Sequence, residues 1–316
     1  MRAMNMRSRT AADWRLRTRT LALGQRTVVM GVVNITPDSF SDGGLYFAPE
    51  AAVEHALQLL EQGADLLDLG AESTRPGSQA GGDAPAVSAD EEQARLLPVV
   101  EGVMKARPDA IISVDTYKAS TARAALKAGA EIVNDVSGLT WDAEMAAACS
   151  ESGAGVVLMH TRGTPAEWSA QSQLAPDAVL DAVRTGLADS LAVALAAKVA
   201  AESIVLDPGY GFGKRLEENY SLLARQAELL ALGRPLLAGV SRKSFLANRL
   251  AKRRADADGV EAPRDARESA SLAAMTAAIL HGASIVRVHE VRAAVDAAQV
   301  ADAILEVAGV ESSPLN

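Results

Sequence analysis

The chain has 316 residues, 49% of them hydrophobic and 22% charged, and its 31 lysines and arginines against 40 aspartates and glutamates give a net charge of −9. This acidic balance lacks the basic footprint of general nucleic-acid binding, so no nucleic-acid partner is expected, although a local anion pocket is compatible with it. The single cysteine, Cys149, excludes an internal disulfide and a thiolate zinc cluster, and no run of ~20 apolar residues suits a membrane span. We therefore expect a cytoplasmic protein without a membrane partner, in which Cys149 is a buried, unreactive thiol.

Short apolar segments alternate with longer helical patterns along almost the whole chain, and no Pro-, Gly- or Ser-rich linker divides it. Buried strands that alternate with helices indicate a parallel sheet, and eight such units in about 280 residues fit a (β/α)8 TIM barrel. A doubly wound open sheet is the alternative, but no G-x-G-x-x-G motif follows the first strand. The predicted strands are VVMGVV (28–33), DLLDLG (65–70), AIISVD (110–115), EIVND (131–135), GVVLMH (155–160), SIVLD (203–207), PLLAG (235–239) and SIVRVH (284–289), and the predicted helices include residues 51–62, 90–105, 119–128, 178–197, 218–230 and 269–280.

Residues 14–307 are predicted to form one barrel domain, with tails at 1–13 and 308–316. Two short strands, 14–16 and 20–23, are predicted to form a β-hairpin that plugs the N-terminal end of the barrel. Residues 36–47 and 74–88 form long loops on the side where barrel active sites are built, which indicates mobile lids or, alternatively, plain surface loops. The densely charged residues 251–268 are predicted to form a solvated surface segment.

Polar and charged side chains stand at the carboxyl ends of the apolar runs. Asn34, Asp115, Asn134 and Asp207 follow four of the predicted strands, and Lys243 lies just past the seventh. Because the carboxyl ends of barrel strands converge on one mouth, we expect these residues to share one polar basin. Helix capping is an equally good interpretation of Asp115, since aspartate is a favoured N-cap residue.

The last strand carries a cation and an imidazole near its end. Arg287 and His289 alternate with Val286 and Val288, so the period of two predicts that both side chains point to the same face of the strand. An arginine fork beside a second hydrogen-bond donor forms a plausible anion clamp. The alternative is a structural ion pair between Arg287 and an aspartate or glutamate.

The basin combines acceptors with a single lysine, which suits a flat heterocycle that has N–H groups on one edge and a carbonyl on another. Lys243 is also compatible with Schiff-base chemistry, the serious chemical alternative within this fold. We expect Asp115 and Asp207 to raise the pKa of Lys243 and keep it protonated. The segment DPGYGFGK (207–214) lacks P-loop spacing and is predicted to form a tight glycine turn that brings Phe212 to a ligand.

Seven segments together resemble the dihydropteroate synthases, in the order of that family and over residues 14 to 305. They are VVMGVVNITPDSFSDGG (28–44), DLLDLGAESTRPGS (65–78), ISVDTYKASTARAALKAGAEIVNDVSG (112–138), VVLMHTRGTP (156–165), IVLDPGYGFGK (204–214), GVSRKSF (239–245) and GASIVRVHEV (282–291). Thr161 and Tyr210 depart from the family, which often has apolar residues there. The resemblance implies a TIM barrel that condenses 6-hydroxymethyl-7,8-dihydropterin diphosphate with 4-aminobenzoate in folate biosynthesis, a sulfonamide target, and a homodimer.

The resemblance also implies roles for individual residues. The pterin would be held by Asp115, Asn134, Asp207 and Lys243, and its pocket would be lined by Met159 and Phe212. The diphosphate would be surrounded by Asn34, Arg75, Arg287 and His289, and Mg²⁺ would be bound by Asn34, with Asp38 as a helper. The aminobenzoate side would be formed by Thr74, Pro76, Phe40, Lys243 and Ser244. Two alternatives stay open: a non-catalytic pterin-binding homologue, and a pterin-dependent methyltransferase barrel. The methyltransferase has no use for NITPDSFSDGG, STRPG or SRKS, and no diphosphate residue expected of a synthase is missing.

Overall fold

The computed structural model describes residues 11–36, 49–75, 77–82, 87–253 and 264–311. In this part of the chain, eight parallel strands close into a barrel in the order β10-β3-β4-β5-β6-β7-β8-β9. All eight correspond to the predicted apolar runs, and the open sheet is excluded. The strands are β3 (Val28–Asn34), β4 (Leu66–Gly70), β5 (Ile112–Asp115), β6 (Ile132–Asp135), β7 (Gly155–Met159), β8 (Ile204–Asp207), β9 (Leu236–Ala238) and β10 (Ala283–Val288).

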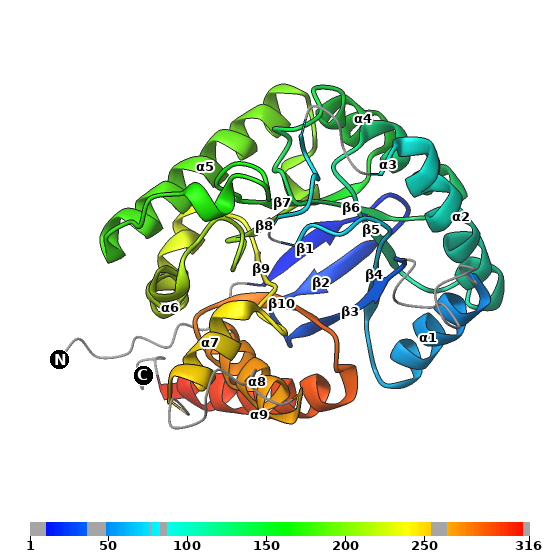
Figure 1. The fold of residues 1–316 in the computed structure, drawn as a ribbon. Coiled ribbons are helices and arrows are strands. Elements are labelled where there is room, and N and C mark those ends of the chain that lie inside the picture. Colours follow the sequence, from blue (N-terminus) through cyan, green and yellow to red (C-terminus); the bar gives the residue numbers. More distant parts are fainter. Residues whose placement is uncertain (1–10, 37–48, 76, 83–86, 254–263, 312–316) are drawn as a thin grey trace.

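Helices form an outer ring around the strands (Figure 1). The α-helices are α1 (Pro49–Glu61), α2 (Ala89–Ala106), α3 (Ala119–Ala128), α4 (Met145–Ser152), α5 (Pro176–Ala196), α6 (Leu216–Arg225), α7 (Ser244–Arg253), α8 (Arg264–Leu280) and α9 (Val291–Glu311), and short 3-10 turns are η1 (Trp168–Ala170), η2 (Ala201–Ser203) and η3 (Gln226–Leu232). This alternation of strands and helices is the predicted (β/α)8 barrel. None of the described helices is both long and apolar enough to cross a membrane.

The alternation of side chains along each strand builds two separate apolar cores. Leu67 and Leu69 of β4 face outward and join the large cluster between the sheet and the helices, which also contains Cys149. Leu66 faces inward and packs in the centre of the barrel. Burial raises the pKa of Cys149 to about 12, which confirms the prediction of an unreactive thiol.

A β-hairpin of β1 (Ala12–Arg15) and β2 (Thr20–Leu23) closes the N-terminal end of the barrel, as predicted. Trp14 packs against the inward-facing strand residues, and its Nε1 donates to the Ser203 carbonyl at 2.8 Å. The hairpin begins at Ala12 rather than at residue 14. It keeps this end of the barrel apolar, so the opposite end is left for polar chemistry.

Other predicted boundaries also differ from the structure. The charged segment 251–268 is partly helical, since α7 ends at Arg253 and α8 begins at Arg264; its residues are good helix formers. Helix α9 continues to Glu311, past the predicted end of the barrel at 307. The helix predicted over 218–230 is α-helical only to Arg225 and continues as the 3-10 turn η3. At this change the buried Gln226 side chain accepts from the Tyr210 hydroxyl and donates to two carbonyls at the end of α8.

Candidate active site

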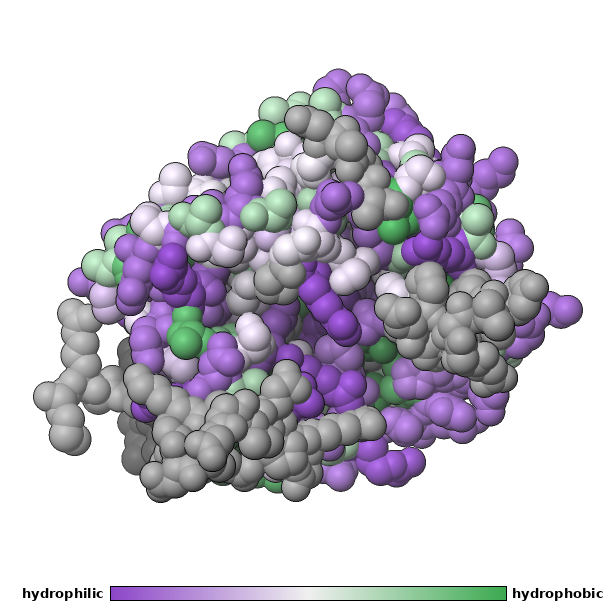
Figure 2. All heavy atoms as spheres, viewed as in Figure 1, coloured by the Kyte–Doolittle hydropathy of each residue, from purple (hydrophilic) through white to green (hydrophobic). Residues whose placement is uncertain are grey.

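The carboxyl ends of the strands form the polar end of the barrel, and hydrophilic side chains gather in a central hollow on the face seen in Figure 2. Arg287 of β10 crosses this mouth and pairs with two carboxylates. Its Nε lies 2.5 Å from Asp68 Oδ2, and its terminal nitrogen lies 2.7 Å from Asp115 Oδ2. The predicted outward partners, Val286 and Val288, pack in the helix-side core, so the strand period of β10 is confirmed.

Asp68 is the residue of this network that the sequence prediction missed. It lies in the middle of β4 with no exposed surface, and it accepts from Ser113 Oγ at 2.6 Å and from Asn134 Nδ2 at 3.0 Å as well as from Arg287. Four strands are joined through this one carboxylate. The available signal was an aspartate within an apolar run, on the face opposite Leu67 and Leu69.

Asp115 takes part in this network rather than capping the following helix. Helix α3 has no side-chain cap from Asp115, and its first amide, on Ala119, donates to Asp142 at 2.8 Å. Burial raises the pKa of Asp115 to about 7, although Arg287 opposes the shift, and the neighbouring Asp68 carboxylate raises the pKa further. The capping interpretation is therefore wrong, and Asp115 is a carboxyl group that titrates near neutral pH.

Lys243 follows β9, the strand next to β10, and its Nζ lies 4.0 Å from the centre of the Phe212 ring. The pKa of Lys243 is lowered to about 8. Burial is the main cause and the Arg287 charge adds to it, while Asp207 and Asp115 act in the opposite direction. The prediction of a raised pKa is wrong, because the loss of solvation outweighs both carboxylates. The ammonium stays the major form at pH 7, and it has a larger neutral fraction than an exposed lysine.

The segment after β8 forms the predicted glycine turn. Asp207 Oδ1 accepts from the Gly209 amide at 2.7 Å, and the buried Lys214 ammonium donates to the carbonyls of His160, Gly209 and Phe212. Gly209 has a φ of +68°, and a Cβ there would stand 1.9 Å from the His160 carbonyl oxygen. Only glycine fits this position, and the turn places Phe212 beside Lys243.

An apolar wall completes this side of the mouth. Met159, Ala80, Tyr117 and Val136 form a small buried cluster, against which Phe212 and Trp141 pack. Ala80 belongs to the loop after β4, so this loop reaches the mouth at Ala80. A flat ring bound here would contact the apolar Met159 and Phe212 side chains and have the carboxylates at its edge.

His289 lies beside this network, just past β10. Its Nδ1 lies 3.0 Å from Ser241 Oγ, and the His289 backbone amide donates to the same oxygen at 3.3 Å. The pKa of His289 is lowered to about 3. Burial is the main cause, and the positive charges of Arg287, Arg242, Lys243 and Arg75 act in the same direction. The imidazole is therefore neutral at physiological pH.

The remaining predicted site residues lie at the rim. Asn34 is exposed at the end of β3, Thr74 is half-buried, and Arg75 and Ser244 are exposed, with Ser244 as the first residue of α7. The positive charge of Arg75 acts on His289, which places Arg75 on the same side of the mouth as His289. Three further predicted residues, Asp38, Phe40 and Pro76, lie outside the described residues.

Three other polar groups near strand ends turn away from the mouth. Glu72 binds Lys118, Asp135 accepts from the amides of Ser137 and Leu139, and the buried His160 ring faces Gly186 of α5. These groups stabilise loops and packing, so a polar residue near a strand end is not sufficient to define the basin.

Comparisons with known proteins match this site and fold. Residues 30–289 match the family model for pterin binding enzymes. The dihydropteroate synthase of Mycobacterium leprae (strain TN) is 45% identical over 279 residues, which covers 88% of this chain and 93% of that protein. The solved Xanthomonas albilineans dihydropteroate synthase with 4-aminobenzoic acid has a TM-score of 0.80 at 38% identity, covering 96% of this chain and 100% of the other. The Yersinia pestis dihydropteroate synthase in a sulfonamide drug complex has a TM-score of 0.81 at 37% identity, covering 93% and 99%.

A closed barrel with acceptors, a partly buried arginine and an apolar wall at its mouth defines a (β/α)8-barrel protein suited to a flat polar heterocycle. The sequence matches are more specific than this class. With a family model over residues 30–289 and a relative 45% identical across most of its length, the chain belongs to the dihydropteroate synthase family. The predicted resemblance and the predicted enzyme class, a transferase, are thereby confirmed.

Proposed function

We propose that the chain condenses 6-hydroxymethyl-7,8-dihydropterin diphosphate with 4-aminobenzoate, forming 7,8-dihydropteroate and diphosphate in cytoplasmic folate biosynthesis. The observation that carries the proposal is the contact between Asp115 and Arg287. In this proposal Asp115 accepts from pterin N–H groups, and Arg287 directly beside it binds the diphosphate. The 4-aminobenzoic acid bound to the Xanthomonas albilineans relative supports the second substrate.

In this proposal the pterin ring lies against the Met159 and Phe212 side chains, which line its pocket. Asp115 and Asp207 accept hydrogen bonds from its N–H groups, and the Asn134 amide pairs with a donor and an acceptor on the ring edge. Lys243 donates to a ring carbonyl or nitrogen. The two carboxylates also favour the positive charge that develops on the pterin methylene as its C–O bond breaks.

The diphosphate end is assigned to Arg287, His289 and Arg75. Arginine donors stabilise the charge on the departing diphosphate, and the neutral imidazole supplies a further N–H donor. The amine nitrogen of aminobenzoate then forms the new C–N bond and loses a proton, so the protein needs no strong nucleophile of its own. Ser244, at the N-terminus of α7, is proposed to bind the aminobenzoate carboxylate. Thr74, Phe40 and Pro76, which the resemblance implies, would contribute to the same side.

The residues present fit a single Mg²⁺ ion held mainly by substrate. No group of three or more His, Cys, Asp or Glu side chains in the described ranges forms a metal cage. Mg²⁺ is commonly held by one or two protein oxygens together with phosphates and water, and the exposed Asn34 amide at the end of β3 offers such an oxygen. Asn34, with Asp38 as a helper, would hold the ion, which when bound would neutralise charge on the diphosphate.

We also propose a homodimer, for which α9 provides support. Val300, Ile304 and Val307 are spaced along one face of this helix and are 61%, 40% and 64% exposed. An exposed apolar stripe of this kind is typical of an interface. Sedimentation velocity should show a dimer for the native protein and monomers for the double variant Val300→Glu/Ile304→Glu, with unchanged secondary structure.

The test of the proposed function is dihydropteroate formation from the two substrates, measured with and without Mg²⁺. We expect turnover that requires Mg²⁺ and is inhibited competitively against aminobenzoate by a sulfonamide, in line with the Yersinia pestis complex. Pterin binding without any turnover would identify the non-catalytic homologue. Methyl transfer from a reduced folate to a corrinoid would identify the methyltransferase alternative.

A further inference from the structure

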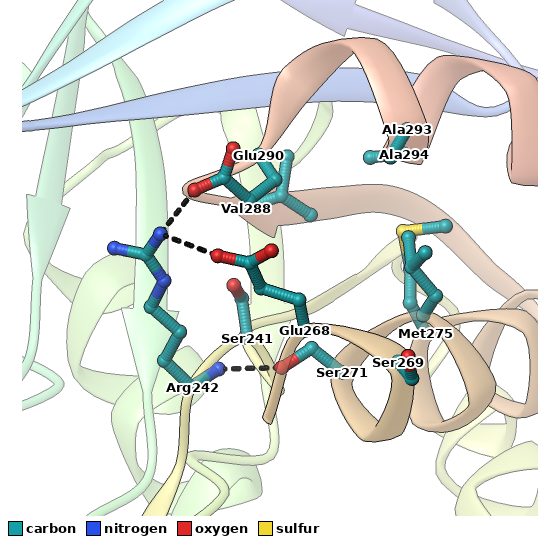
Figure 3. Close-up of a pocket in the computed structure, with 11 residues that line it drawn as sticks. Ser241, Arg242, Glu268, Ser269, Ser271, Met275, Val288, Glu290, Ala293 and Ala294 are labelled. Carbon is teal, nitrogen blue, oxygen red and sulfur yellow. Dashed lines mark hydrogen bonds and ion pairs between the residues drawn. The ribbon is translucent and has the colours of Figure 1, made fainter. Parts of the chain in front are cut away.

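Two consecutive residues after β9 contact two consecutive residues after β10. Ser241 binds His289 through both its ring Nδ1 and its backbone amide, and the Arg242 guanidinium binds Glu290 and, at 3.4 Å, Glu268 of α8 (Figure 3). These contacts join the turn that carries Lys243 to the turn that carries Arg287 and His289. Neither Ser241 nor Arg242 has a role in the proposed chemistry.

The hydrogen count at Ser241 determines the tautomer of His289. A serine hydroxyl has one hydrogen to donate and two lone pairs. The His289 amide already donates to Ser241 Oγ at 3.3 Å, so the hydroxyl hydrogen is available for Nδ1, 3.0 Å away. With a hydrogen on Nδ1 instead, two donors would point at this buried oxygen and its own hydrogen would need another acceptor. The favourable arrangement makes Nδ1 an acceptor and leaves the ring hydrogen on Nε2.

The charges around His289 support a neutral ring with a single N–H. The positive groups that act on it are Arg287 on its own strand, Arg242 and Lys243 on the neighbouring turn, and Arg75 after β4. A second ring proton would add a further positive charge to this cluster, and Glu290, which follows His289 in the chain, is itself engaged by Arg242. His289 therefore offers one donor, and its position on the ring decides whether that donor can reach a ligand.

Arg242 fixes the turn that holds Ser241. Its φ of +57° lies in the left-handed region, which is unfavourable for a residue with a side chain. The Arg242 amide donates to Ser271 Oγ at 2.9 Å, and Ser271 in turn donates to the Arg267 carbonyl at 2.7 Å. Three contacts to α8 and the start of α9 thus hold this backbone in place (Figure 3).

We propose that Ser241 is a positioning residue that fixes His289 as the Nε2–H tautomer, and that Arg242 holds the turn in which Ser241 does so. The imidazole then gives one neutral hydrogen bond to a diphosphate oxygen. This inference rests on the proposed function for the identity of the anion, but the tautomer itself does not depend on turnover.

A cavity of about 290 Å³ makes the inference testable by conservative substitution. Ser241, Arg242 and Ser271 line it together with the apolar side chains of Met275, Ala293 and Ala294 (Figure 3). The extra methyl group of Ser241→Thr can enter this space while the hydroxyl is kept. Ser241→Ala removes the hydroxyl without adding volume, and both variants are expected to fold.

The experiment records imidazole ¹⁵N spectra of the full chain, free and with inorganic diphosphate and Mg²⁺. The chain has four histidines, so the His289 signals are assigned by their loss in His289→Gln. Native protein and Ser241→Thr should show a protonated Nε2 and an unprotonated Nδ1, whereas Ser241→Ala should show a mixture of tautomers. The control is Ser221→Ala, whose hydroxyl donates to Glu217 within α6, and it should match the native spectrum.

Steady-state kinetics provide the second measurement. Losing one oriented hydrogen bond should raise the KM for the pterin diphosphate roughly three- to tenfold in Ser241→Ala, with little change for aminobenzoate. Ser241→Thr should recover most of this loss. A hydrogen on Nδ1 in the native spectrum, or an Ser241→Ala variant with native tautomer and KM, would overturn the inference. Absence of any dihydropteroate from the native chain would instead refute the proposed function, and the spectra would still test the tautomer.

Discussion

Replacing Asp68 separates two contributions of the buried network, its hydrogen bonds and its charge. Asp68→Ala removes the acceptor of Arg287, Asn134 and Ser113 and leaves a space in the strand face. Asp68→Asn keeps the shape, and its amide oxygen can accept from Arg287 and Asn134. The Ser113 hydroxyl can rotate to accept from the new amide hydrogen.

The expected cost follows from these contacts. Arg287 Nε, Asn134 Nδ2 and Ser113 Oγ lie 2.5, 3.0 and 2.6 Å from the Asp68 oxygens, and Asp68 has no exposed surface. A buried donor that loses its acceptor costs about 1–3 kcal/mol, and breaking a buried ion pair costs about 3–5 kcal/mol. Because Arg287 keeps Asp115, we expect a loss of about 3–5 kcal/mol in total for Asp68→Ala. Asp68→Asn should lose less, about 1–3 kcal/mol, since Arg287 and Asn134 keep an acceptor and only the Ser113 hydroxyl hydrogen loses one.

Urea denaturation at pH 7 measures both free energies of unfolding. The matched control is Asp109→Asn in the exposed Arg107–Asp109 pair, which should leave the midpoint unchanged. If Asp68→Ala were as stable as Asp68→Asn, the hydrogen bonds at Asp68 would not hold the network. If both variants lost several kcal/mol, the buried charge would be the stabilising feature, contrary to our reasoning.

Four further predictions concern ligand binding and the pH dependence of stability. Because burial raises the pKa of Asp115 to about 7 and the carboxylate is the accepting form, pterin affinity measured by calorimetry should increase from pH 6 to 8, and Asp115→Asn should abolish this increase. The same raised pKa means that the folded protein holds this proton more tightly than the unfolded chain, so the stability due to Asp115 should be lost as the pH rises through 7. The free energy of unfolding of the native protein should therefore fall relative to that of Asp115→Asn between pH 5 and 8, as measured by denaturation at both pH values. Treatment with borohydride in the presence of both substrates should give no mass adduct on Lys243, since the role of Lys243 is to donate hydrogen bonds; an adduct would establish a Schiff base. The Lys243→Arg variant should still bind pterin, but more weakly. Aminobenzoate should bind weakly to the free protein and more tightly with diphosphate and Mg²⁺, and equal affinities would indicate a preformed site.

The barrel could be predicted from the sequence because each strand is a short apolar run between clear helical patterns. The direction of Arg287 and His289 followed from the strand period alone, which depends only on local geometry. The hairpin was predictable for a similar reason, since its strands are close in sequence. These features require no knowledge of which strands become neighbours across the barrel.

The partners in the mouth could not be predicted in this way. Asp68 and Arg287 are 219 residues apart in the sequence, and only barrel closure through β10 and β3 brings them together. The pKa of Lys243 was predicted with the wrong sign because its nearby carboxylates could be inferred from the motifs, whereas its loss of solvation could not. The tautomer of His289 likewise depends on a contact between two turns.

Arg287 shares one positive charge between two carboxylates, so the three groups carry a net negative charge whenever Asp68 and Asp115 are both ionised. An isolated diphosphate approaching Arg287 would meet this charge. Under the proposed function, the pterin N–H groups compensate Asp115, and its hold on Arg287 weakens as they bind. The arginine can then turn one edge of its planar fork toward phosphate oxygens while Asp68 keeps the other. Under the proposed function, ring and diphosphate would therefore be recognised together, and the two interpretations of Arg287, anion clamp and structural ion pair, would describe two states of the same residue.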